Sequence, residues 1–149
     1  MDALDLTTRP PRTCRTELGG IRYVPRAIDK VRGSLPGGTM GAYINTADGV
    51  ITMSALFYRT MAITHEEFVS AVTEAPDEAA VLAWLCARID DERIAKWNVR
   101  LLRVRLSDVP VESRALIAAI YPDSASFPQD ALMIDVIDHD DAETFGKFA

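Results

Sequence analysis

The sequence lacks a long hydrophobic run, and this absence excludes a membrane-spanning helix. Its longest apolar stretch, Val50 to Leu56, is interrupted by Thr52 and Ser54, whereas a transmembrane helix needs about 20 predominantly apolar residues. The N-terminus turns basic and proline-rich without the apolar segment that a secretory signal requires. We therefore expect a cytoplasmic protein with no membrane partner.

Cysteine is scarce, and its placement argues against both a disulfide and a metal site. Cys14 and Cys86 are the two cysteines of the chain, and neither belongs to a C-x-x-C pair. His65 and His139 lie far from both in the sequence, so the spacing of a metal site is missing. Cys86 falls within an apolar helical pattern, where a buried reduced thiol is the commoner state. We expect no structural disulfide and no metal.

The chain also lacks the motifs that identify common enzymes. It contains no recognisable catalytic triad, phosphate-binding loop or dinucleotide fingerprint. Its serines, Ser54 among them, lack the strand-turn-helix glycine frame of a nucleophile elbow. We therefore assign no catalytic residue and no cofactor. Whether the protein is an enzyme stays open, and the sequence favours a non-enzymatic role.

What the sequence does contain is a globular composition with a strong charge gradient. Hydrophobic residues make up 48% of the chain and charged residues 26%, which is typical of a folded domain. Residues 1–35 carry seven basic and four acidic groups, whereas residues 108–149 carry two and nine. We expect the basic segment to pack against the acidic one, within one molecule or across a homodimer. The overall charge of −6 argues against a nucleic-acid partner.

Helical periodicity governs most of the chain after the first residues. Pro10 and Pro11 keep residues 1–16 extended, and a helix is predicted to follow, with Thr16 as its N-cap. We predict an all-α, compact single domain of about five to seven helices. Residues 1–16 would form an extended basic arm, and residues 17–149 a helical core with an acidic C-terminal segment. The predicted core consists of Ile21, Val24, Ile28, Phe57, Phe68, Val72, Leu82, Leu85, Trp97 and Leu101.

Local signals differ in strength along this core. Thr64 and Glu67 have the spacing of a capping box, which predicts that a helix begins there. The apolar residues 50–61 favour a buried helix, but their β-branched start leaves a strand open. Residues 131–137 fit a helix or a strand.

Several short blocks occur in an order that resembles a known family. They are Pro10-Pro11-Arg12, Leu18-Gly19-Gly20, Pro25-Arg26, Ile28-Asp29-Lys30, Gly41-Ala42-Tyr43 and Trp97-Asn98. With them, the chain resembles the uncharacterised bacterial family catalogued as domain of unknown function 5069 over most of its length. Residues 47–61 and 101–127 depart from the family pattern. The resemblance implies a small bacterial cytosolic protein, and it carries over no catalytic residue because the family has no established activity.

The polar side of the predicted first helix, with the arm before it, forms the main candidate site. Arginine presents a planar, permanently charged fork that suits carboxylate or phosphate ligands. Asp29 could orient Arg26 or Lys30, and Asn98 could join them if its helix packs nearby. The candidate ligand-binding residues are Arg12, Arg22, Tyr23, Arg26, Asp29, Lys30 and Asn98.

The same charges also fit a solvated helix face, on which Arg22 and Arg26 pair with Asp29. The sequence therefore favours a non-enzymatic bacterial interaction or scaffold protein, acting as a homodimer or with a protein partner. The alternative is binding, or turnover, of a small anionic metabolite at the Arg/Lys cluster of the first helix.

Overall fold

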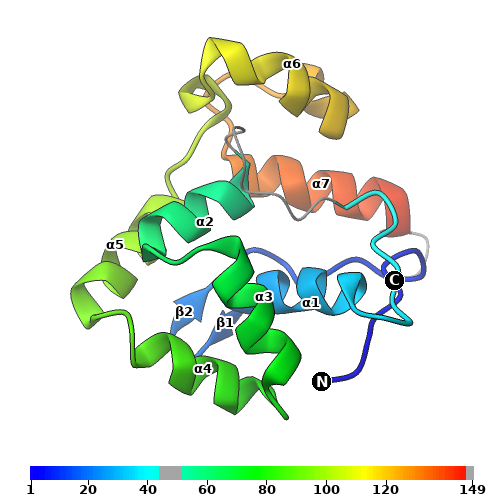
Figure 1. Ribbon diagram of the computed structural model, residues 1–149. Helices are drawn as coiled ribbons and strands as arrows, with labels where there is room; N and C mark the ends of the chain where they lie inside the picture. The colour runs from blue at the N-terminus through cyan, green and yellow to red at the C-terminus, as the bar shows by residue number, and fades with distance from the viewer. Residues whose placement is uncertain (44–51, 147–149) are drawn as a thin grey trace.

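The computed structural model describes residues 1–43 and 52–146, and helices dominate this part of the chain (Figure 1). It contains seven α-helices and one two-stranded sheet. The prediction of a mostly helical, compact domain is confirmed, but the domain is not purely all-α. The elements are β1 (Glu17–Leu18), β2 (Ile21–Arg22), α1 (Val24–Ser34), α2 (Met53–Met61), α3 (His65–Glu74), α4 (Glu78–Cys86), α5 (Asp91–Leu101), α6 (Val111–Ile120) and α7 (Met133–Phe145).

The sheet is an antiparallel hairpin, and it replaces the first turns of a predicted helix. Between β1 and β2, Gly19 and Gly20 have positive φ angles of 56° and 78°. Such two-residue turns match the twist of a hairpin, and glycine adopts them without steric cost. Thr16 therefore caps no helix, and α1 begins at Val24 after the N-cap residue Tyr23.

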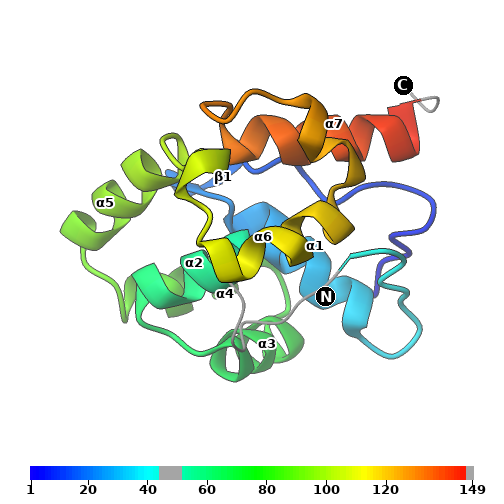
Figure 2. The ribbon, with the colours of Figure 1, turned by 90° about the horizontal axis from the view of Figure 1, so that it is seen from above.

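Helix α1 lies at the centre of the fold, and the other elements cover it. Helix α3 packs on α1, while α5 packs on α2 and β2. Helix α7 runs beside α1, and α6 lies at the top of Figure 1, nearest the viewer in Figure 2, where it is drawn over α1 and α2 and to one side of α7. This arrangement leaves α1 buried along most of its length, including the charged residues Arg26, Asp29 and Lys30.

An aromatic cluster joins α1 to the helices that pack around it. The ring of Phe57 lies 5.2 Å from that of Trp97, 5.3 Å from that of Tyr23 and 5.9 Å from that of Phe68, measured between centroids. All four rings are fully buried. The predicted core is confirmed at nine of its ten positions, and the tenth, Leu82, is half-buried and packs against this core.

The N-terminal segment before β1 contains no helix and is held against the domain. Leu6 and Cys14 are buried, and the backbone N–H of Leu6 donates to the carbonyl oxygen of Thr39 at 2.9 Å. Arg15 pairs with Asp135 and Asp138 of α7. The predicted attraction between the basic N-terminal and acidic C-terminal segments is thus confirmed, and it acts within one molecule.

Most of the two segments of open assignment, 50–61 and 131–137, is helical, and Leu132 in the second forms an isolated β-bridge with Arg105 just before its helix. Helix α2 covers Met53–Met61, while Val50 and Ile51 lie outside the described residues. Helix α7 begins at Met133, within the second segment. Cys86 is exposed, contrary to expectation, and both cysteines are free thiols. No helix in the described part of the chain has the length and apolar character needed to cross a bilayer.

Candidate functional site

Three charged residues of α1, namely Arg26, Asp29 and Lys30, are buried, and two of them belong to ion pairs with residues outside this helix. Arg12, in the N-terminal segment, donates from Nε to Oδ2 of Asp29 at 2.9 Å and from Nη2 to Oδ1 at 2.8 Å. Glu78 of α4 accepts further hydrogen bonds from the same guanidinium. Asp29 is 1% exposed, so a solvated helix face is the wrong interpretation of this position.

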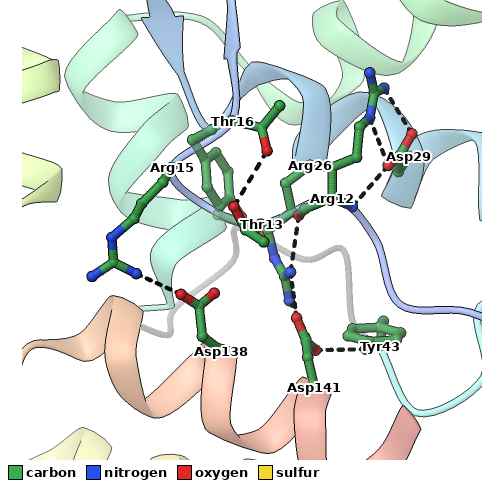
Figure 3. Close-up of polar contacts among 11 residues, drawn as sticks. Arg12, Thr13, Arg15, Thr16, Arg26, Asp29, Tyr43, Asp138 and Asp141 are labelled. Atoms are coloured by element: carbon green, nitrogen blue, oxygen red, sulfur yellow. Dashed lines mark hydrogen bonds and ion pairs between the residues drawn. The ribbon is translucent and has the colours of Figure 1, made fainter. Parts of the chain in front are cut away.

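Arg26 forms the second buried ion pair, which joins α1 to α7. Its Nη1 donates to Oδ2 of Asp141 at 2.7 Å and to the carbonyl oxygen of Arg12 at 3.1 Å. The hydroxyl of Tyr43 donates to Oδ1 of Asp141 at 2.6 Å, and Figure 3 shows Arg26 and Tyr43 meeting at this carboxylate. Nη2 of Arg26 also lies 3.4 Å from Oδ1 of Asp141, so both ends of the guanidinium face this carboxylate. The carboxylate balances the charge of Arg26 inside the protein.

Lys30, one turn further along α1, has a different environment. Its Nζ lies 2.7 Å from Oγ of Ser54 in the first turn of α2, and that oxygen lies 2.8 Å from the hydroxyl of Tyr23. Lys30 is 7% exposed and Ser54 is 4% exposed. Among the residues that the structure describes, no carboxylate forms an ion pair with Lys30. Lys30 is therefore a buried lysine whose Nζ donates to Ser54, and the Tyr23 hydroxyl contacts the same serine oxygen.

Burial changes the acid-base behaviour of this group. Desolvation, reinforced by the positive charge of Arg26, lowers the pKa of Lys30 to about 7, although Cys14 and Asp141 act in the opposite direction. Burial also raises the pKa of Tyr23, so its phenol stays protonated. At neutral pH, Lys30 can therefore exist as an ammonium or as a free amine.

Lys30, Ser54 and Tyr23 line a cavity of about 410 Å³. Its volume lies within the range of small-molecule sites, which combine apolar walls with a few polar groups. Asp140 of α7 also lines it, and burial raises the pKa of that carboxyl. The apolar walls come from the N-terminal segment, α2, α7 and the end of α6, and include Leu6, Met53, Ile120, Tyr121, Ile137 and Phe145.

The structure divides the candidate residues into separate groups. Tyr23, Arg26 and Lys30 line the cavity, whereas the pair of Arg12 and Asp29 lies outside the lining. The two remaining candidates, Arg22 and Asn98, meet at the hairpin. The predicted cluster is therefore not one pocket.

Asn98 and Arg22 fasten the hairpin to α5. Oδ1 of Asn98 accepts from the backbone N–H of Arg22 at 3.0 Å, and its Nδ2 donates to the carbonyl oxygen of Gly20 at 2.7 Å. The side chain of Arg22 pairs with Glu17 at 3.1 Å. Asn98 therefore does not complete a pocket with Arg26 or Asp29, because its side-chain amide forms hydrogen bonds with the backbone of the hairpin.

Sequence reasoning missed Ser54, Tyr43 and Asp141 as members of the site. Ser54 lies 24 residues from Lys30, and Asp141 lies 115 residues from Arg26, so no local spacing joins them. One available signal was Ser54 itself, a polar residue within an otherwise apolar segment that was predicted to form a buried helix. The other was a tyrosine within a block shared with the family.

The comparisons with known proteins bear on the whole chain. No curated protein matches it significantly. The model of a family described as a domain of unknown function (DUF5069) matches residues 8–143, a range that contains Tyr23, Arg26, Lys30 and Ser54. The resemblance seen in the sequence is confirmed, and the chain belongs to the DUF5069 family.

Proposed function

We propose that the protein binds a small monocarboxylate, whose carboxylate group meets Lys30 and whose apolar part fills the cavity. One observation carries this proposal: Lys30 is a buried lysine that borders the cavity, and when it is protonated it has no carboxylate partner among the described residues. Buried charges are normally paired, because an unpaired one loses its hydration without compensation. A ligand carboxylate would supply the missing partner.

The charges around the cavity favour a monoanion over a polyanion. Arg26 is already balanced by Asp141, so Lys30 is left to neutralise the ligand. Asp140 also lines the cavity and would repel additional negative charge. The apolar walls favour a short aliphatic or aromatic tail. The predicted binding site for a small anionic metabolite was the Arg/Lys cluster of the first helix, and we now propose that Lys30 alone of this cluster contacts the anion.

The proposal makes binding dependent on pH. A carboxylate beside Nζ stabilises the ammonium form, so it raises the pKa of Lys30 from its value of about 7 in the free protein. Binding above pH 7 must therefore take up a proton. Affinity should fall with rising pH, by up to about tenfold per unit, until the pKa of the complex is reached.

Calorimetric titration with butyrate, hexanoate and benzoate tests the proposal. We expect at least one of them to bind the wild type more tightly at pH 6.5 than at pH 9. Lys30→Met should abolish this binding, whereas Lys96→Met should retain it, because Lys96 is an exposed lysine paired with Glu92 on α5. Equal binding by all three proteins, or binding by none, would contradict the proposal. Tighter binding of inorganic phosphate than of any carboxylate would also contradict it.

The interaction or scaffold role stays a prediction of the sequence analysis, together with bacterial origin, a cytoplasmic location and a homodimer. Among the described residues, the large exposed hydrophobic side chains are Val99 on α5 and Val111 on α6, and neither points to a particular partner. Native mass spectrometry of gently purified protein would report the subunit number and any retained carboxylate in one measurement.

A further inference from the structure

We propose that the same site hydrolyses a small carboxylic ester, with Ser54 as the nucleophile and Lys30 as its general base. The inference rests on the proposed function, because the carboxylate bound there would be the acid product of this reaction. It gives a chemical role to the contacts among Lys30, Ser54 and Tyr23. A site that only binds a carboxylate would not need the lysine and the tyrosine to meet at a serine oxygen.

The distances meet the geometric requirement for an activated serine. Oγ of Ser54 lies 2.7 Å from Nζ of Lys30, which is within direct proton-transfer reach of a general base. The hydroxyl of Tyr23 lies 2.8 Å from the same oxygen and fixes its position from a second direction. All three side chains line the cavity, so a bound ester could reach the serine oxygen.

The surroundings of Lys30 allow it to act as a base. General-base catalysis needs the free amine, which an exposed lysine scarcely populates at neutral pH. The groups facing Lys30 are Arg26 on its own helix, Cys14 in the N-terminal segment and Asp141 on α7. Burial disfavours the charged form of Lys30 most, and the positive charge of Arg26 nearby disfavours it further. A deprotonated amine can then accept the hydroxyl proton of Ser54.

Helix α2 contributes to the site through its N-terminal turn. Ser54 is the second residue of α2, and its neighbours Thr52 and Met53 also line the cavity. The N–H of Ala55 in this turn donates to Oγ1 of Thr52, whereas the N–H groups of Met53 and Ser54 before it have no acceptor within the helix, and the helix dipole is positive there. Both features would stabilise the oxyanion that forms when a nucleophile attacks a carbonyl carbon at this position.

The reaction balances without a cofactor. The oxygen of Ser54 bonds to the ester carbonyl carbon while its proton passes to Nζ of Lys30. The tetrahedral intermediate then collapses, the bond to the alcohol oxygen breaks, and the lysine ammonium protonates the departing alcohol. In the second half, Lys30 takes a proton from water, the resulting hydroxide attacks the acyl-serine, and the proton returns to the serine oxygen. The product acid releases its proton to the solvent and leaves as a carboxylate.

The decisive experiment is acylation of the full-length protein with p-nitrophenyl butyrate, followed by intact mass measurement and peptide mapping. We expect one butyryl group on Ser54 and release of p-nitrophenol that continues beyond one equivalent. Ser54→Ala should lower the rate at least about 100-fold. Ser113→Ala should not, because Ser113 is a comparably buried serine on α6, where no lysine contacts it among the described residues.

The role of Lys30 is tested by the pH dependence of the acylation rate. The wild-type rate should rise with pH through the titration of Lys30 and then level off, and Lys30→Met should lose both the rate and this profile. Acylation of Lys30 or Tyr23 with Ser54 unmodified would overturn the inference, and this outcome can be read on the wild type even if a variant fails to fold.

The failure of each proposal is distinguishable. Carboxylate binding that depends on Lys30, without acylation of Ser54, would overturn the hydrolase inference and leave the proposed function in place. Acylation of Ser54 without measurable carboxylate binding would overturn the proposed function. The absence of both would overturn both.

Discussion

Asp29 and Glu78 both contact the guanidinium of Arg12 but differ in burial. Their contributions to the free energy of unfolding can therefore be separated. Asp29 is 1% exposed and accepts from Nε, Nη2 and the backbone N–H of Arg12. Glu78 contacts the outer side of Arg12, and its side chain is 30% exposed. The buried carboxylate should contribute more to stability than the exposed one. Its loss leaves the guanidinium with uncompensated charge and unmet hydrogen bonds where water cannot replace them.

We therefore expect Asp29→Asn to lower the free energy of unfolding by about 2–4 kcal/mol. Glu78→Gln should lower it by less than about 1 kcal/mol, because water screens this contact. Urea denaturation at pH 7, followed by circular dichroism, measures both. Similar losses for the two variants would show that Asp29 has no special role in holding the N-terminal segment on α1.

At the scale of single elements, α2 ends in a conformation that its sequence does not favour. Its C-cap residue Ala62 has a φ of 53°, in the left-handed region where a Cβ is unfavourable, and it is exposed. Glycine is the usual residue at such helix ends. The C-cap residue of α4, Ala87, has a φ of −71° and is also exposed, so it provides a matched control.

We expect Ala62→Gly to stabilise the protein by about 0.5–1 kcal/mol, because relief of the strain exceeds the entropy lost by a flexible glycine. Ala87→Gly should destabilise it by up to about 1 kcal/mol, because only the entropy cost remains. Thermal unfolding of the two variants beside the wild type gives the sign directly. A loss of stability in Ala62→Gly would mean that the left-handed residue carries no strain.

The elements that the sequence predicted well are those with local causes. Thr64 Oγ1 accepts from the N–H of Glu67 at 3.1 Å, and the N–H of Thr64 donates to Oε2 of Glu67 at 2.8 Å, as the capping-box spacing predicts. The hairpin was missed because the apolar spacing around Ile21 fits a helix. The signal that outweighs it is Gly19-Gly20, which favours a tight turn between two short strands.

At the scale of the whole molecule, the site depends on contacts that sequence spacing does not reveal. Tyr23, Arg26 and Lys30 were predicted because they share one helix. Their partners Ser54 and Asp141 come from α2 and α7, and the packing of those helices on α1 decides which charges are balanced. Whether a charged residue pairs inside the protein or remains for a ligand is therefore a property of the tertiary fold.

The burial of Lys30 makes the free energy of unfolding of the whole protein depend on pH. Its pKa is about 7 in the folded protein and about 10.4 in an unfolded chain. Between these values the unfolded state binds more protons, so the contribution of Lys30 to stability rises with pH. Below pH 7 both states are protonated, and the full cost of burying the ammonium is present. Cys14, whose pKa burial raises to about 11, acts in the opposite direction above pH 9.

Comparison of the wild type with Lys30→Met isolates this effect, because the other titrating groups are common to both proteins. We expect Lys30→Met to be the more stable protein at pH 7, since methionine occupies the buried position without a charge. From pH 7 to pH 9 the wild type should gain about 2 kcal/mol relative to the variant. Urea denaturation at pH 7, 8 and 9 measures the difference. A difference that stays constant with pH would show that Lys30 titrates as an ordinary lysine, and the free amine needed at the site would then be absent at neutral pH.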